Sequence, residues 1–168
     1  ADAVLAVSNT ADGEARIRDI YGDRCVVIPY LMPGFDLARY CATAFPKEKT
    51  SNTIGMVLLK HGIFSFGDTA RESYERMIEL VGMAETYLEK HRALRTNQNA
   101  PAPFKATALD MARLREAISK VAAFPLLLRT FGDEQSLAFA QHPDCNKFSQ
   151  RGPVTPDHII RTKRTPMF

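Results

Sequence analysis

His61 is the side chain in this sequence best placed to do chemistry, because imidazole binds metal ions and this residue follows a predicted strand. An apolar segment at residues 54–59 leads to His61, and Gly62 comes directly after it. A histidine at the end of a buried strand can present its ring at the rim of a sheet, where binding loops gather. From the residue alone, two interpretations stay open: a histidine that caps the strand, which is the commoner case, and a metal ligand.

A metal site needs several donors, and the sequence offers His61 few companions. Zinc takes three or four ligands from His, Cys, Asp and Glu. No two of the four histidines have H-x-H or H-x-x-x-H spacing, and Cys25, Cys41 and Cys145 are odd in number and far apart. This pattern argues against a cysteine zinc site and a disulfide framework. We therefore expect free thiols and a cytoplasmic location.

A second candidate site lies near the end of the chain. Arg161 and Lys163 follow His158 in a segment that also contains two prolines. These side chains could bind a phosphate or carboxylate, since the guanidinium fork matches such anions. The alternative is a structural connector whose path the prolines fix, and the sequence leaves both interpretations open.

The elements that would position these residues alternate between strand and helix, which predicts an α/β or α+β fold. Apolar, β-branched segments bounded by turn residues predict the strands. Pro46 and Pro125 are expected to end two of the helices, and residues 95–104 form a predicted linker. The predicted strands cover residues 25–30, 54–59, 63–67 and 126–131, and the predicted helices cover residues 14–20, 36–44, 70–88, 109–124 and 134–141.

The helix that follows His61 has the clearest sequence pattern. Thr69 and Glu72 have the spacing of a capping box, and Glu72 and Arg76 have that of an i,i+4 ion pair. Apolar residues recur at helical spacing on one face, which we expect to be buried. That face consists of Ala70, Tyr74, Met77, Ile78, Val81, Ala84 and Leu88.

Composition excludes several classes of partner. The chain has 168 residues and a formal net charge of +3, which a cluster of basic residues between positions 151 and 164 accounts for. A nucleic-acid surface is usually broader and more basic, so we expect no nucleic-acid partner. No apolar run approaches the roughly 20 residues that cross a bilayer. The sequence therefore predicts neither a membrane span nor a signal peptide.

Residues 53–76 as a whole resemble the class II aldolase/adducin family. The resemblance consists of an apolar strand, then His61-Gly62 and an apolar residue, a short turn to Gly67, and a helix that contains Tyr74 and Glu75. It implies an α/β fold, the three-layer sandwich of that family. It also implies that His61 is a ligand of a catalytic divalent metal, usually zinc.

A closer similarity covers most of the chain. Residues 1–10, 32–36 and 152–163 are similar to the aldolase part of bifunctional rhamnulose-1-phosphate aldolase/short-chain dehydrogenase proteins. In that subgroup an H-x-H motif supplies the other two histidine ligands directly before the segment that matches the start of this chain. The similarity implies that residues 1–100 are the C-terminal half of the aldolase domain and residues 101–168 a helical and connecting segment. The sandwich would then be incomplete at its N-terminal side.

The function implied by this resemblance is that of a fragment of a divalent-metal-dependent sugar-phosphate aldolase, not catalytic alone. Such a lyase breaks a carbon–carbon bond through a metal-stabilised enediolate, and its substrate would be a phosphorylated sugar or a small aldehyde or ketone. The family implies a homo-oligomer and a tyrosine proton donor, for which Tyr30 is the candidate; the alternative is a strand-end tyrosine with a solvated hydroxyl. An adducin-like interaction domain, and an epimerase or decarboxylase of the same superfamily, remain alternatives.

Overall fold

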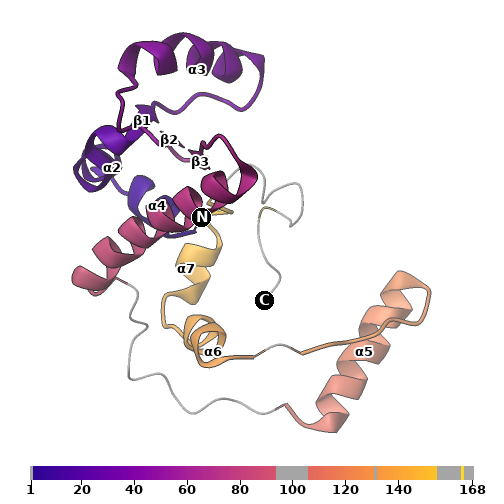
Figure 1. The fold of residues 1–168 in the computed structure, drawn as a ribbon. Coiled ribbons are helices and arrows are strands. Elements are labelled where there is room, and N and C mark those ends of the chain that lie inside the picture. The colour runs from indigo at the N-terminus through magenta and orange to yellow at the C-terminus, as the bar shows by residue number, and fades with distance from the viewer. Residues whose placement is uncertain (1, 94–105, 131, 155–163, 165–168) are drawn as a thin grey trace. The chain divides into compact units, whose positions relative to one another are not determined.

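A computed structural model of the chain describes residues 2–93, 106–130, 132–154 and 164 (Figure 1). The chain divides into two compact units, one of residues 1–94 and 149–168 and the other of residues 95–148. Within the described ranges, no helix is both long enough and apolar enough to cross a membrane.

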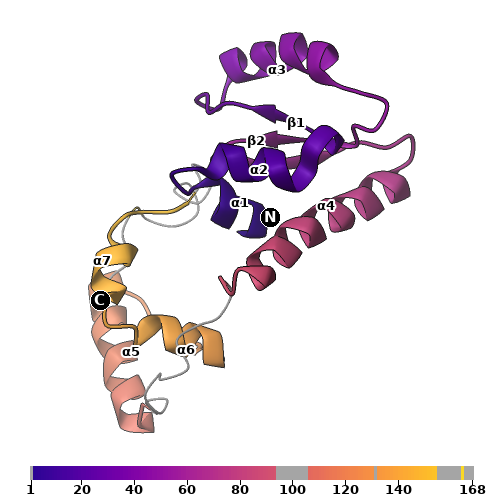
Figure 2. The same cartoon turned by 90° about the vertical axis from the view of Figure 1, so that its left-hand side faces the viewer.

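A three-stranded sheet forms the centre of the first unit (Figures 1 and 2). The strands are β1 (Cys25–Ile28), β2 (Gly55–Leu58) and β3 (Gly62–Ser65), in the order β1-β2-β3. β1 and β2 are parallel, whereas β2 and β3 are antiparallel. The first two strands lie where β-branched and apolar residues predicted them, although both are shorter than predicted.

Helices cover both faces of this sheet, so the unit has three layers. On one face lie α1 (Asp2–Ser8), α2 (Gly13–Tyr21) and α4 (Ala70–Lys90); α3 (Phe35–Glu48) lies on the other. A short 3-10 helix at Gly22–Arg24 joins α2 to β1. This arrangement is the α/β fold expected from the sequence.

Alternation along the strands divides the core between these two faces. Successive strand residues point to opposite sides of a sheet, and accordingly Val27 and Val57 pack toward α1, α2 and α4, while Val26 and Leu58 pack toward α3. The core on the side of α4 also contains a buried hydrogen bond. In it the Tyr21 hydroxyl donates to the backbone oxygen of Leu80 at 2.9 Å.

Two helices differ from the prediction. Pro46 does not end α3, which continues to Glu48, because a proline in the last turn removes only one helical hydrogen bond. In α4 the predicted buried face is partly wrong: Tyr74 and Ile78 are 67% and 57% exposed. The helix buries a neighbouring stripe at i, i+4 and i+8, and this stripe consists of Leu80, Ala84 and Leu88.

The second unit is helical where it is described. It contains α5 (Ala108–Ala122) and α6 (Glu134–Ala140), and α7 (Cys145–Ser149) begins in it. The predicted strand at residues 126–131 is wrong, because residues 125–130 have no regular structure and Leu127 is 94% exposed. A strand needs a partner for its backbone groups, and no described strand of this unit offers one. Residue 131 and the predicted linker at 95–104 lie outside the described residues.

Cys25 gives the folded chain a testable pH dependence. The side chain lies in the core on the side of α4, and burial raises the pKa of its thiol from 9.0 to about 12. Below pH 9 both the folded and the unfolded chain keep this proton, so the stability is unaffected there. Between about pH 9 and pH 12 only the unfolded chain releases the proton, and the free energy of unfolding falls as pH rises.

We expect the free energy of unfolding, measured in urea, to fall by about 2 kcal/mol from pH 8.5 to pH 11 through Cys25 alone. Cys25→Ala should be less stable at pH 8.5, because it leaves a cavity, but should show a shallower decline. Burial also raises the pKa of Tyr21, with a smaller contribution from Cys25, so part of the decline remains in Cys25→Ala. Equal slopes in the two proteins would contradict burial of the thiol.

Candidate functional site

The candidate site lies at the edge of the sheet where β1 and β2 end. Because these strands are parallel, the residues that follow them emerge at the same edge, which is where ligands bind in open α/β sheets. The ladder continues one step beyond the strands, with the backbone nitrogen of Leu59 donating to the oxygen of Ile28 at 3.0 Å. Tyr30 follows β1 and His61 follows β2, so the fold brings both predicted residues to this edge.

His61 is held by the tight turn between β2 and β3. Its backbone nitrogen donates to the oxygen of Leu58 at 3.0 Å. On either side of it, Lys60 has φ of 61° and Gly62 has φ of 157°, values that only glycine adopts freely. Gly62 is therefore required by the backbone, whereas Lys60 is a side-chain-bearing residue in a left-handed conformation.

The imidazole ring of His61 has an unusual environment. The residue is half-buried, and its Nδ1 atom is buried without a hydrogen-bond partner among the described residues. A buried polar atom without a partner costs free energy, of the order of 1–3 kcal/mol. Such atoms need an explanation, and an unplaced ion is one of the usual ones.

Tyr30 lies beside this turn and is partly exposed. The side chain is 44% exposed, and its hydroxyl approaches the sulfur of Met32 at 3.9 Å. The ammonium nitrogen of Lys60 lies 5.9 Å from the centre of the Tyr30 ring, within the range of a cation–π contact. The two strand ends are therefore linked through side chains as well as through the ladder.

The other histidines in the described parts of the chain have structural partners. The Nδ1 atom of His91 is 2.8 Å from the backbone oxygen of Tyr87, just beyond α4, and its ring stacks on that tyrosine with centroids 4.1 Å apart. In the second unit, His142 Nδ1 accepts from the backbone nitrogen of Asp144 at 3.1 Å. The fourth histidine is His158, a predicted anion-binding residue, and it lies outside the described residues, as do Arg161 and Lys163.

The described residues supply one metal donor at this edge but not a complete metal site. No group of three or more His, Cys, Asp or Glu side chains that could hold a metal ion occurs among them. His61 suits a divalent metal, both by its imidazole and by its unpaired Nδ1, and zinc would need at least two further protein ligands.

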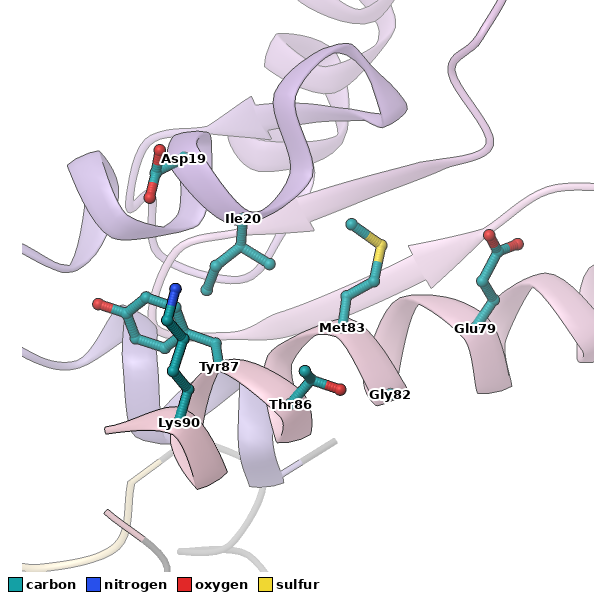
Figure 3. Close-up of a pocket in the computed structure, with 8 residues that line it drawn as sticks. All are labelled: Asp19, Ile20, Glu79, Gly82, Met83, Thr86, Tyr87 and Lys90. Carbon is teal, nitrogen blue, oxygen red and sulfur yellow. The ribbon is translucent and has the colours of Figure 1, made fainter. Parts of the chain in front are cut away.

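A separate groove lies between α2 and α4 (Figure 3). It has a volume of about 510 Å³ and contains no histidine or cysteine. Its apolar side chains come from Ile20, Met83 and Tyr87, and its charged ones from Asp19, Glu79 and Lys90. Glu79 is already paired with Arg24 at 2.6 Å, so this groove offers a weaker case for chemistry than the turn at His61.

The sequence pattern singled out His61 as a candidate but not its neighbour Lys60. The sequence shows Lys60 only as the polar residue that closes a strand. Its left-handed backbone belongs to the turn between β2 and β3, and its contact with Tyr30 depends on the pairing of β1 with β2, which brings residues 30 positions apart together. One feature of the sequence could have drawn attention to Lys60. Gly62 follows Lys60 and His61 between two predicted strands, and glycine at such a point predicts a tight turn.

The chain belongs to the class II aldolase/adducin family. Residues 1–88, just over half of the chain, match the family described as "Class II Aldolase and Adducin N-terminal domain". Residues 105–168 match the family described as "Aldolase class II, second domain". Members of the class II aldolase family are generally dependent on a divalent metal.

Two known proteins are similar to this chain. One is an uncharacterized oxidoreductase of Bacillus subtilis (strain 168), YuxG, which is 26% identical over 173 residues. That match includes 99% of this chain but 25% of the relative, so the chain spans a quarter of that protein's length. The oxidoreductase name of this longer relative fits the resemblance to bifunctional aldolase/dehydrogenase proteins.

The other is a solved structure, the N-terminal class II aldolase domain of a conserved protein from Thermoplasma acidophilum. It is 41% identical, with 52% of this chain and 39% of that chain covered and a TM-score of 0.46.

Proposed function

We propose that this chain is part of a divalent-metal-dependent sugar-phosphate aldolase, and that His61 is one of its metal ligands. One observation carries the proposal: the buried, unpaired Nδ1 atom of His61 at the carboxyl edge of two parallel strands. Membership of a family that is generally metal-dependent supports it. The remaining ligands would come from outside the described residues.

The chemistry assigned to the metal in such enzymes is stabilisation of the enediolate that forms when a carbon–carbon bond breaks. The role of this chain is to hold His61 at the sheet edge through the Leu58–Gly62 turn. Tyr30 is proposed as the group that moves a proton, because its exposed hydroxyl lies beside the same edge. We propose a phosphorylated sugar as substrate, with Arg161, Lys163 and His158 as candidates for binding its anionic group.

A non-catalytic, adducin-like role is the second candidate function, and one observation favours it. No complete set of metal ligands is found in the described part of the chain. The two functions make different demands on the gene. An aldolase requires a His-x-His codon pair upstream of Ala1, whereas an interaction domain does not.

The activity of the 168-residue chain tests the proposed function. With zinc present, we expect this chain alone not to accelerate retro-aldol cleavage of a ketose 1-phosphate, followed by a coupled assay for the aldehyde product. The same protein extended through an upstream His-x-His segment should cleave the sugar and lose activity when a chelator removes the metal. An extended protein without metal-dependent cleavage, or a gene without that codon pair, would favour the adducin-like role.

A further inference from the structure

Lys60 has features that a merely solvated lysine does not require. Its φ of 61° places it in the left-handed region, where a lysine is strained and asparagine or glycine is tolerated. A strained residue next to a candidate ligand suggests that its side chain is needed there. That side chain ends in an ammonium group, which can bind an anion.

The electrostatic environment of Lys60 favours an anion. The described residues form eight ion pairs, and Lys60 takes part in none of them. The contact that it does make is with the ring of Tyr30, at 5.9 Å. An aromatic ring limits where the ammonium can lie without neutralising its charge. Lys60 is thus an exposed, uncompensated cation next to His61.

The space around the turn is open on the side of Gly62. A side-chain carbon at Gly62 would have nothing within 4 Å, and the turn lies at the carboxyl edge of β1 and β2, where ligands of open sheets bind. The turn therefore has open space on the side of Gly62, and Lys60 itself is exposed to solvent. A second lysine, Lys49, lies before the opposite end of β2, in a groove with Thr53 and Phe66.

We propose that Lys60 binds the anionic oxygens of a phosphate monoester beside His61, with the Tyr30 ring limiting the position of its ammonium group. Lys60 would thereby help to position a phosphorylated ligand at this edge. The identity of the ligand as a sugar phosphate rests on the proposed function, but binding of the phosphate group itself does not. The metal is not needed for this contact, which allows the two ideas to be tested separately.

The test is a titration of the metal-free 168-residue chain with inorganic phosphate at low ionic strength, followed by amide NMR. We expect saturable shifts at His61 and Gly62. Lys60→Asn tolerates the left-handed backbone but has no charge, and it should bind phosphate at least tenfold more weakly without a lower melting temperature. Lys60→Arg should retain binding, and the control Lys49→Met should leave it unchanged.

The outcomes separate this proposal from the proposed function. Equal phosphate affinity in the Lys60→Asn variant and the unmodified chain would overturn the role of Lys60, and so would shifts confined to the region of Lys49. Loss of phosphate binding in Lys60→Asn supports the proposal even if zinc never binds His61. In that case it is the metal-dependent function that fails, while the anion site stands.

Discussion

Replacing Gly13 by alanine should destabilise the first unit by about 3 kcal/mol or more, at the upper end for overpacking. A Cβ atom at this position would lie 2.3 Å from the backbone oxygen of Ser8 and 2.8 Å from that of Val7. These atoms belong to α1 and cannot move aside as a flexible side chain could. The substitution must push α1 away from α2, and both helices contribute to the core around Ile17.

Gly82→Ala is the matched control for this prediction. Gly82 lies within α4, and a Cβ atom there would have nothing within 4 Å. The free energy of unfolding of this control should rise by roughly 0.5–1 kcal/mol, because alanine has a higher helix propensity than glycine. Circular dichroism melts of the three proteins give the comparison. If Gly13→Ala melts within a degree of the unmodified chain, the packing of α1 on α2 described above is wrong.

Replacing His61 by alanine should weaken zinc binding by about a hundredfold or more in a protein that carries the whole ligand set. Changes to residues that merely hydrogen-bond to metal ligands already lower metal affinity about 10–100-fold. Loss of a ligand itself should lower the affinity at least as much. Without metal, the melting temperature should not fall. The substitution removes a buried Nδ1 atom that has no partner in the described structure, which offsets the lost packing.

His91→Ala is the control for this second prediction. His91 contacts Tyr87 through both its Nδ1 atom and its ring, so its loss should lower the melting temperature slightly. Zinc affinity should stay as it was. Isothermal titration calorimetry measures the affinities of both variants. The assignment of His61 fails if its variant binds zinc as tightly as the unmodified protein does.

Local patterns in the sequence predicted much of the first unit correctly. A β-branched run marked Cys25–Ile28, and an apolar run marked Gly55–Leu58. The Thr69 side chain caps α4 as predicted, by accepting from the nitrogen of Glu72. These features depend on residues close in the sequence. The carboxylate of Glu72 instead accepts from the nitrogen of Asp68 at 2.8 Å, one residue from the predicted partner.

Features that depend on distant contacts could not be predicted in the same way. Periodicity predicted one apolar face on α4, and packing against α1 and the sheet decided that Leu80, which lies outside that face, is buried while Tyr74 is exposed. The contact between Lys60 and Tyr30 arises only when β1 pairs with β2. The segment 126–130 has no described strand to pair with. A strand-like sequence pattern was therefore not sufficient to form a strand there.

Paramagnetic broadening of amide signals by Co²⁺ tests the central claim most directly, because it locates the ion even when binding is weak. In the 168-residue chain, we expect the signals of Lys60, His61 and Gly62 to broaden first, followed by that of Tyr30. The His61→Ala variant should lose this broadening. Broadening centred on His91, His142 or His158, or broadening at the turn that persists in the His61→Ala variant, would contradict the assignment of His61 as a metal ligand.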